Sequence, residues 1–113
     1  MDNAELLKHA TEFVFTPTRE EGEEEVEALR HFRVYVKWRS EGKYSVSYFN
    51  EVWNGEGWEY EPQPSSREDD FLKRTRFSLD KAVGIASALP DTLVMNGRTY
   101  REWYELQRSD KKK

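Results

Sequence analysis

The segment His31–Phe49 reads HFRVYVKWRSEGKYSVSYF, and it decides the fold. Side chains in its first half alternate strictly between two kinds. The even-numbered positions carry the apolar side chains Phe32, Val34, Val36 and Trp38. The odd-numbered positions carry His31, Arg33, Tyr35, Lys37 and Arg39. Alternation with a period of two residues is typical of a β-strand that has one buried face and one solvent-facing face.

The second half of the segment repeats this pattern after a short turn that contains Gly42. Its large side chains are Tyr44, Val46 and Tyr48, and the residues between them are Ser45 and Ser47. Two alternating runs joined by a glycine-containing turn predict a β-hairpin. We expect Ser45 and Ser47 on its wet face, together with the basic residues of the first strand.

Further strands are expected on both sides of a tight turn at Asn54-Gly55-Glu56-Gly57. We predict that the second hairpin strand continues to Trp53 and that a third strand lies near Trp58–Glu61. The alternation in Phe71–Phe77 predicts a fourth strand.

Helices are expected before, after and at the end of these strands. An apolar stripe predicts a helix over residues 3–14, which Thr16-Pro17-Thr18 ends. Ser78 is a good N-cap for a helix that ends at Pro90. Thr99 and Glu102 match a capping box, which predicts a short C-terminal helix.

The expected fold class is α+β: an antiparallel sheet of three to five strands, built on a β-hairpin or meander, with two or three helices packed mainly on one face. The length of 113 residues indicates one domain, 1–113. Nine acidic and two basic residues lie at positions 1–27. We expect the acidic loop 16–28 and the tail 109–113 to be mobile.

Composition limits the class of protein. Only 36% of the residues are hydrophobic, but 14% are aromatic, and large rings can supply a core. There is no cysteine, so disulfide scaffolds and thiol catalysis are excluded. No apolar run approaches a membrane span, and the first residues lack the order of a signal peptide, so we expect a cytoplasmic chain without membrane partners.

The sequence offers no recognisable catalytic motif. It has only two histidines, His9 and His31, and it lacks both a nucleophile elbow and a glycine-rich phosphate loop. In the run Glu68-Asp69-Asp70, only Glu68 and Asp70 would share one side of an extended segment, and solubility or a helix start explains the run as well. We expect no enzyme, no metal and no cofactor, and a metal-dependent enzyme using these two acids is the third alternative.

The leading functional hypothesis is a small protein-binding module, either an inhibitor or an adaptor. Exposed tryptophan and tyrosine side chains are good anchors at protein interfaces. Candidates near the glycine-rich turn and in the acidic loop are Trp53, Trp58, Tyr60, Glu23, Glu24 and Glu25. The compact, cysteine-free and motif-poor chain is similar in a general way to small accessory proteins of bacterial viruses. The same strand positions also suit a core, and this alternative stays open.

The runner-up hypothesis is a domain that binds single-stranded nucleic acid through the wet face of the hairpin. Aromatic rings there can stack on unpaired bases while cations contact phosphates. The candidates are Arg33, Tyr35, Lys37, Arg39 and Phe49. The net charge of −4 gives no bulk attraction to nucleic acid, so such a site must be a local patch. The sequence leaves the partner and the oligomeric state open.

Overall fold

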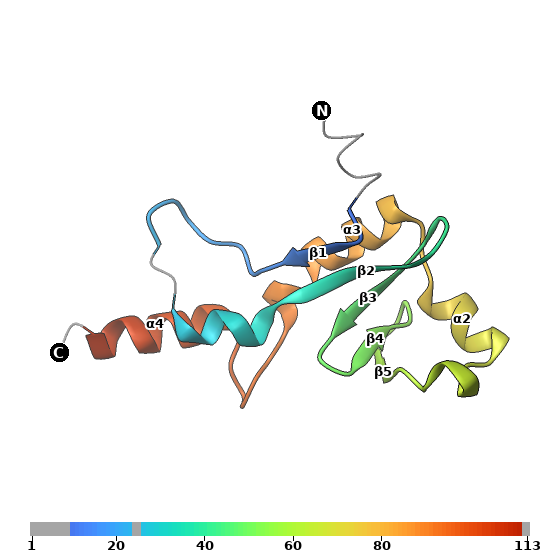
Figure 1. Cartoon of the computed structure of the whole chain (residues 1–113). Coiled ribbons are helices and arrows are strands. Elements are labelled where there is room, and N and C mark those ends of the chain that lie inside the picture. The colour runs from blue at the N-terminus through green and yellow to red at the C-terminus, as the bar shows by residue number, and fades with distance from the viewer. Residues whose placement is uncertain (1–9, 24–25, 112–113) are drawn as a thin grey trace, which may run out of the picture.

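The computed structural model describes residues 10–23 and 26–111 (Figure 1). Its strands are β1 (Glu12–Phe15), β2 (Val34–Ser40), β3 (Lys43–Tyr48), β4 (Glu51–Trp53) and β5 (Trp58–Tyr60). Its α-helices are α2 (Asp69–Thr75), α3 (Leu79–Ala88) and α4 (Tyr100–Lys111). Three 3-10 turns are η1 (Glu27–Phe32), η2 (Pro64–Ser66) and η3 (Pro90–Thr92). None of the described helices has the length and apolar character needed to cross a membrane.

The strands form one antiparallel meander in the order β1-β2-β3-β4-β5. Val36 pairs with Val46 and Tyr35 with Ser47, so the predicted β2–β3 hairpin is confirmed. The expected α+β class is confirmed as well, since a five-stranded antiparallel sheet is accompanied by three α-helices in the described residues.

One face of the sheet, here called the core face, holds the main hydrophobic core. Val34, Val36 and Val46 are fully buried there, together with Ala82 and Ala86 of α3. The 3-10 turn η1 continues this core toward α4, beside which it lies in Figure 1, because the Phe32 ring contacts the Tyr100 ring edge-on at 5.8 Å. The helix α3 therefore covers the core face, whereas α4 packs on η1 beyond the end of the sheet.

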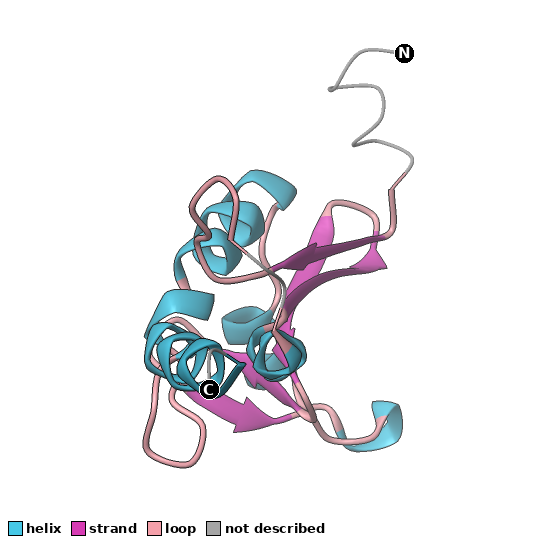
Figure 2. Cartoon of the chain, turned by 90° about the vertical axis from the view of Figure 1, so that its left-hand side faces the viewer, coloured by secondary structure: helices cyan, strands magenta, loops and turns pink. Residues whose placement is uncertain are grey.

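The opposite face, here called the α2 face, carries Tyr35, Lys37, Ser45, Ser47, Val52 and Glu59 by strand alternation and register. Figure 2 shows helical ribbon on both sides of the strands. The helix α2 belongs to this second side, because Arg74 of α2 donates two hydrogen bonds of 2.7 and 2.8 Å to Glu59. Phe71 and Thr75 of α2 are buried but lie outside the main core cluster.

Two predicted elements are wrong in type. Residues 12–14 were expected in a helix but belong to β1, because Phe13 and Phe15 take alternate positions against the core while β1 pairs with β2. Residues 3–9 of that prediction lie outside the described residues. The expected strand Phe71–Phe77 is instead helix α2, in which Asp69 and Asp70 suit the helix start. Of that segment Phe77 forms a single bridge, to Tyr44.

Details of the predicted hairpin also need correction. The second strand ends at Tyr48, and Trp53 belongs to the separate strand β4, because the chain reverses at Phe49-Asn50. Ser45 and Ser47 are buried rather than solvent-facing, on the side of the sheet to which α2 belongs, and their hydroxyls lie 3.4 Å apart. Trp38 lies on the core face by strand alternation, but it is 49% exposed because it is at the end of the hairpin, outside the core cluster.

The remaining helix signals are confirmed. The Ser78 hydroxyl accepts a hydrogen bond from the Lys81 backbone N–H, which caps α3. The Thr99 hydroxyl accepts from the Glu102 N–H while the Glu102 carboxylate accepts from the Thr99 N–H, so the capping box precedes α4 as predicted. The helix backbone continues to Lys111, beyond the expected start of the tail at residue 109.

Candidate functional site

Three arginines surround one carboxylate on the α2 face. Arg76 lies 2.8 Å and Arg39 3.1 Å from the same oxygen of Glu61, Oε1, and Arg67 lies 3.8 Å from the other oxygen. All four side chains are largely buried, and that of Arg76 is only 7% exposed. We call this group the arginine cluster: Arg39, Arg67, Arg76 and Glu61.

Separate elements bring these side chains together. The strand register shifts between Trp38 and Ser40, so Arg39 sits at a β-bulge, a feature that commonly redirects a side chain. Arg67 follows η2, and its Nε donates to the Pro62 carbonyl at 3.0 Å. Arg76 follows α2 directly, where it also approaches the Thr75 hydroxyl at 3.2 Å. The cluster therefore depends on the bulge in β2 and on the positions of η2 and α2, which bring the three arginines to Glu61.

The cluster borders a pocket with an excess of positive charge. Its volume is about 250 Å³, and it is lined by Arg39, Ser40, Lys43, Arg67, Leu72 and Arg76. One glutamate can balance only one of the four positive charges. The pKa of Arg76 is lowered, first by burial and further by the nearby charges of Arg39 and Arg67, against the opposing effect of Glu61. The pocket is thus suited to an anion.

Glu61 also lines a second pocket. It has a volume of about 350 Å³ and is lined by Lys37, Ser47, Phe49, Asn50, Glu51, Val52, Tyr60 and Glu61. Two of its rings are strongly exposed, Phe49 by 67% and Tyr60 by 68%. We call Phe49 and Tyr60 the exposed ring pair. Flat exposed rings beside a lysine provide surfaces on which planar groups can stack.

Phe49 occupies an unfavourable backbone conformation. Its φ angle is 53°, in the left-handed region that non-glycine residues rarely adopt. It connects β3 to β4 in a two-residue turn, a place that usually holds glycine or asparagine. An exposed phenylalanine with an unfavourable backbone is often retained for a role other than folding.

The predicted nucleic-acid residues divide into two groups. Lys37 and Phe49 line the second pocket, and Arg39 belongs to the arginine cluster. Arg33 lies beyond the opposite end of β2, six residues from Arg39 or about 20 Å along an extended strand. Tyr35 lies between them, with the Lys37 ammonium 5.5 Å from its ring centroid.

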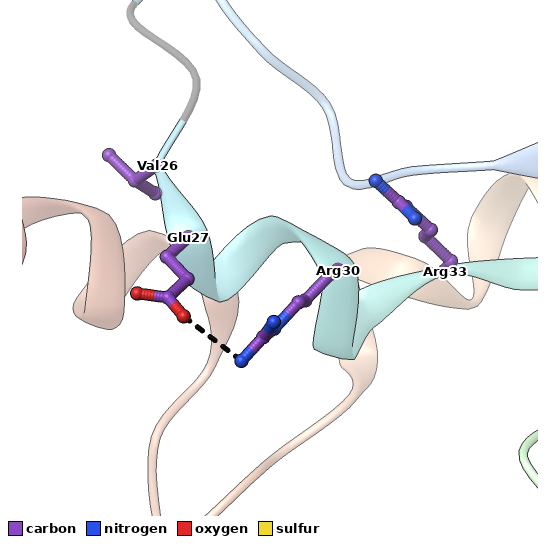
Figure 3. Close-up of a pocket in the computed structure, with 4 residues that line it drawn as sticks. All are labelled: Val26, Glu27, Arg30 and Arg33. Atoms are coloured by element: carbon purple, nitrogen blue, oxygen red, sulfur yellow. Dashed lines mark ion pairs between the residues drawn. The ribbon is translucent and has the colours of Figure 1, made fainter.

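Arg33 adjoins a different pocket, shown in Figure 3. Val26, Glu27, Arg30 and Arg33 line it, and its volume is about 350 Å³. Arg30 forms an ion pair of 3.0 Å with Glu27, whereas Arg33 points away from that pair (Figure 3). This pocket therefore lacks the concentration of positive charge found beside the arginine cluster.

Of the predicted protein-binding residues, the structure brings Trp53 and Trp58 into contact, whereas Glu23 lies elsewhere. Trp53 and Trp58 form a T-shaped ring pair with centroids 5.2 Å apart, and both are partly buried against the core. Tyr60 is exposed on β5, at the edge of the sheet. The Glu23 carboxylate pairs with Arg101 of α4, which lowers the pKa of that carboxyl. Glu24 and Glu25 lie outside the described residues.

The sequence analysis did not single out two cationic members of the charged pocket, Lys43 and Arg67. Arg76 was expected in a strand. Their convergence depends on α2 and on the bridge between Phe77 and Tyr44, whose two backbone hydrogen bonds are both 2.8 Å. The density of arginine at positions 67–76 was the only local signal.

Comparison with protein-family models, with curated proteins and with solved structures gives no match for this chain.

Proposed function

We propose that this chain binds single-stranded nucleic acid at the two pockets described above. The observation that carries the proposal is that Glu61 connects the two pockets: it lines the pocket of the exposed ring pair and forms ion pairs with three arginines that line the charged pocket. One pocket offers four cationic side chains, and the other offers the exposed ring pair. Stacking of bases on aromatic rings combined with cations for the backbone is the general mode by which proteins hold unpaired strands.

A double helix suits this surface less well than a single strand. Bases inside a duplex are already stacked and do not present their faces to protein side chains. Phe49 and Tyr60 lie on a turn and on an edge strand, where their exposed rings are available to bases that are not already stacked. The overall charge of −4 also requires that attraction come from a local patch.

The test is fluorescence anisotropy with a labelled single-stranded oligonucleotide of about 15 nucleotides, as DNA and as RNA, and with the matching duplex. We expect Phe49→Ala and Tyr60→Ala each to weaken binding about tenfold, because a base–aromatic stack contributes about 1–3 kcal/mol. Trp38→Ala is the matched control, since Trp38 is an exposed ring that lines neither pocket. Equal loss in the control would contradict the proposed surface.

Salt supplies an independent check. If about three phosphates contact cations, the logarithm of the association constant should fall with the logarithm of salt concentration with a slope of about −2. Lys37→Gln should reduce this slope, whereas Lys81→Gln, an exposed lysine of α3, should leave it unchanged. Binding that does not respond to salt would overturn the proposal.

A second candidate function is the binding of a protein partner at the edge of the sheet. The observation that favours it is the exposure of Tyr60 on β5, the outermost strand of the described sheet. An extended segment of a partner can add to such an edge by backbone hydrogen bonds, with a ring as its anchor. A pull-down from lysate with nuclease treatment separates the two, because a protein partner held through β5 remains bound after digestion and is lost in Tyr60→Ala.

A further inference from the structure

We infer that the pocket beside the arginine cluster holds the terminal phosphate of a bound single strand. This inference rests on the proposed function and adds a chemical preference to it. The ligand group is a phosphate monoester at the end of a strand, as distinct from the diesters inside the strand.

Charge is the first argument. A phosphate monoester carries about −1.5 to −2 at pH 7, whereas each internal diester carries −1. Arg39, Lys43, Arg67 and Arg76 line the pocket, and Glu61 can balance only one of these charges. A group with nearly two negative charges therefore matches the remaining excess better than a diester does.

Shape is the second argument. The lining residues come from the end of β2, the start of β3, the residue after η2, the helix α2 and the residue after it. A pocket bordered by this many elements admits the end of a chain more easily than its middle, because an internal phosphate needs both an entry and an exit for the strand. The guanidinium groups offer several donors in planar forks, the geometry that suits phosphate oxygens.

Preorganisation is the third argument. Arg76 is held by Glu61 at 2.8 Å, and its guanidinium lies 5.8 Å from the Phe71 ring centroid. Arg67 is held by the Pro62 carbonyl at 3.0 Å. Side chains that are already fixed lose little conformational entropy when a ligand arrives.

The neighbouring pocket places the rest of the strand. Glu61 belongs to the arginine cluster and also lines the pocket of the exposed ring pair. A strand whose terminal phosphate enters the charged pocket can therefore continue past Glu61 to the pocket that Tyr60 and Phe49 line.

The test compares three oligonucleotides of one sequence: with a 5′-phosphate, with a 3′-phosphate, and with hydroxyls at both ends. We expect one of the two phosphorylated strands to bind about tenfold more tightly than the strand without phosphate, which also identifies the end that is recognised. Arg39→Gln and Lys43→Gln should remove this preference, because both side chains line the pocket. Arg74→Gln is the matched control, since Arg74 belongs to α2 but pairs with Glu59 outside the pocket.

The outcomes separate the inference from the proposed function. Equal binding of all three strands, with equal weakening of all three by the pocket variants, would show that the pocket contacts internal phosphates; this overturns the inference and leaves the proposed function intact. Failure of all three strands to bind would overturn both. Binding of a phosphoserine peptide in their place would assign the pocket to a protein partner and also overturn both. Circular dichroism and thermal melting of each variant confirm that it is folded.

Discussion

Arg39 at the end of β2 reaches the same carboxylate oxygen of Glu61 that Arg76 reaches from the residue after α2. The two ion pairs measure 3.1 and 2.8 Å and join the hairpin, the residue after β5 and the chain that follows α2. Glu61 thus has a structural role, because its carboxylate pairs with three guanidinium groups that would otherwise repel one another.

Replacement of Glu61 by glutamine should lower the free energy of unfolding by about 1–3 kcal/mol, because three guanidinium groups would then repel one another in a partly buried site. Added sulfate or phosphate should restore part of the loss in Glu61→Gln and should have a smaller effect on the original protein. Urea denaturation with and without 50 mM of either anion is the measurement, with roughly this concentration chosen to limit general screening. Glu105→Gln on α4, whose side chain is exposed, is the control. If neither anion restores any of the lost unfolding free energy, a bound anion cannot replace the Glu61 carboxylate, and this prediction is wrong.

Two tyrosines, the partly buried Tyr48 and the buried Tyr100, give different predictions for the same chemical change. The Tyr48 hydroxyl donates to the His31 carbonyl at 2.6 Å, whereas the Tyr100 hydroxyl is buried without a hydrogen-bond partner among the described residues. Tyr48→Phe should therefore cost about 1 kcal/mol. Tyr100→Phe should be neutral or stabilising by up to about 1 kcal/mol, since it removes an unsatisfied polar atom and keeps the ring packed on Phe32. Chemical denaturation of both variants gives the comparison, and equal losses would contradict it.

Local patterns in the sequence predicted the elements whose buried residues recur at the spacing of a strand or a helix. The β2–β3 hairpin follows from Val34, Val36 and Val46, and the start of α3 follows from its cap at Ser78. The turn at Asn54 was also predicted from the Asn-Gly pair. In the structure, the Asn54 side-chain oxygen accepts hydrogen bonds from the N–H groups of Glu56 and Gly57, both at 2.9 Å. These features depend on residues within a few positions of one another.

Features that depend on distant partners could not be predicted in this way. The α2 segment alternates like a strand, and it became a helix because Phe71 and Thr75, one turn apart, bury a common side. The reversal at Phe49 runs against residue preference, so no local signal indicated it. The arginine cluster joins residues 39, 61, 67 and 76 through tertiary structure. The sequence therefore predicted Lys37, Arg39 and Phe49 as a basic and aromatic patch but not the pocket that adjoins it.

The pair of Glu59 and Arg74 predicts a loss of stability in acid. The hydrogen bond from Arg74, with a smaller contribution from that of Asn54, lowers the pKa of Glu59 to about 2. A carboxyl whose pKa is lower in the folded state stabilises the protein above its unfolded value of about 4.3, and this contribution is lost as the pH falls toward the folded value. The difference in unfolding free energy between the original protein and Glu59→Gln should therefore shrink between about pH 5 and pH 2. Urea denaturation at several pH values measures this difference, and a constant difference would contradict the assignment.

Phe49 allows folding and binding to be separated in one residue. Its positive φ angle costs about 1–2 kcal/mol, and its ring contacts Tyr48 with centroids 4.6 Å apart, a contribution of about 0.5–1.5 kcal/mol. In Phe49→Gly the relief of the backbone offsets the lost ring contact, so the free energy of unfolding should change by less than about 1 kcal/mol. Affinity for single strands should nevertheless fall about tenfold, because the exposed ring is gone. Phe49→Tyr, which keeps both the ring and the backbone cost, should retain binding. Thermal melting and anisotropy on the three proteins decide the matter: a glycine variant that melts much earlier assigns Phe49 to the fold, whereas unchanged melting with weakened binding assigns its ring to the ligand.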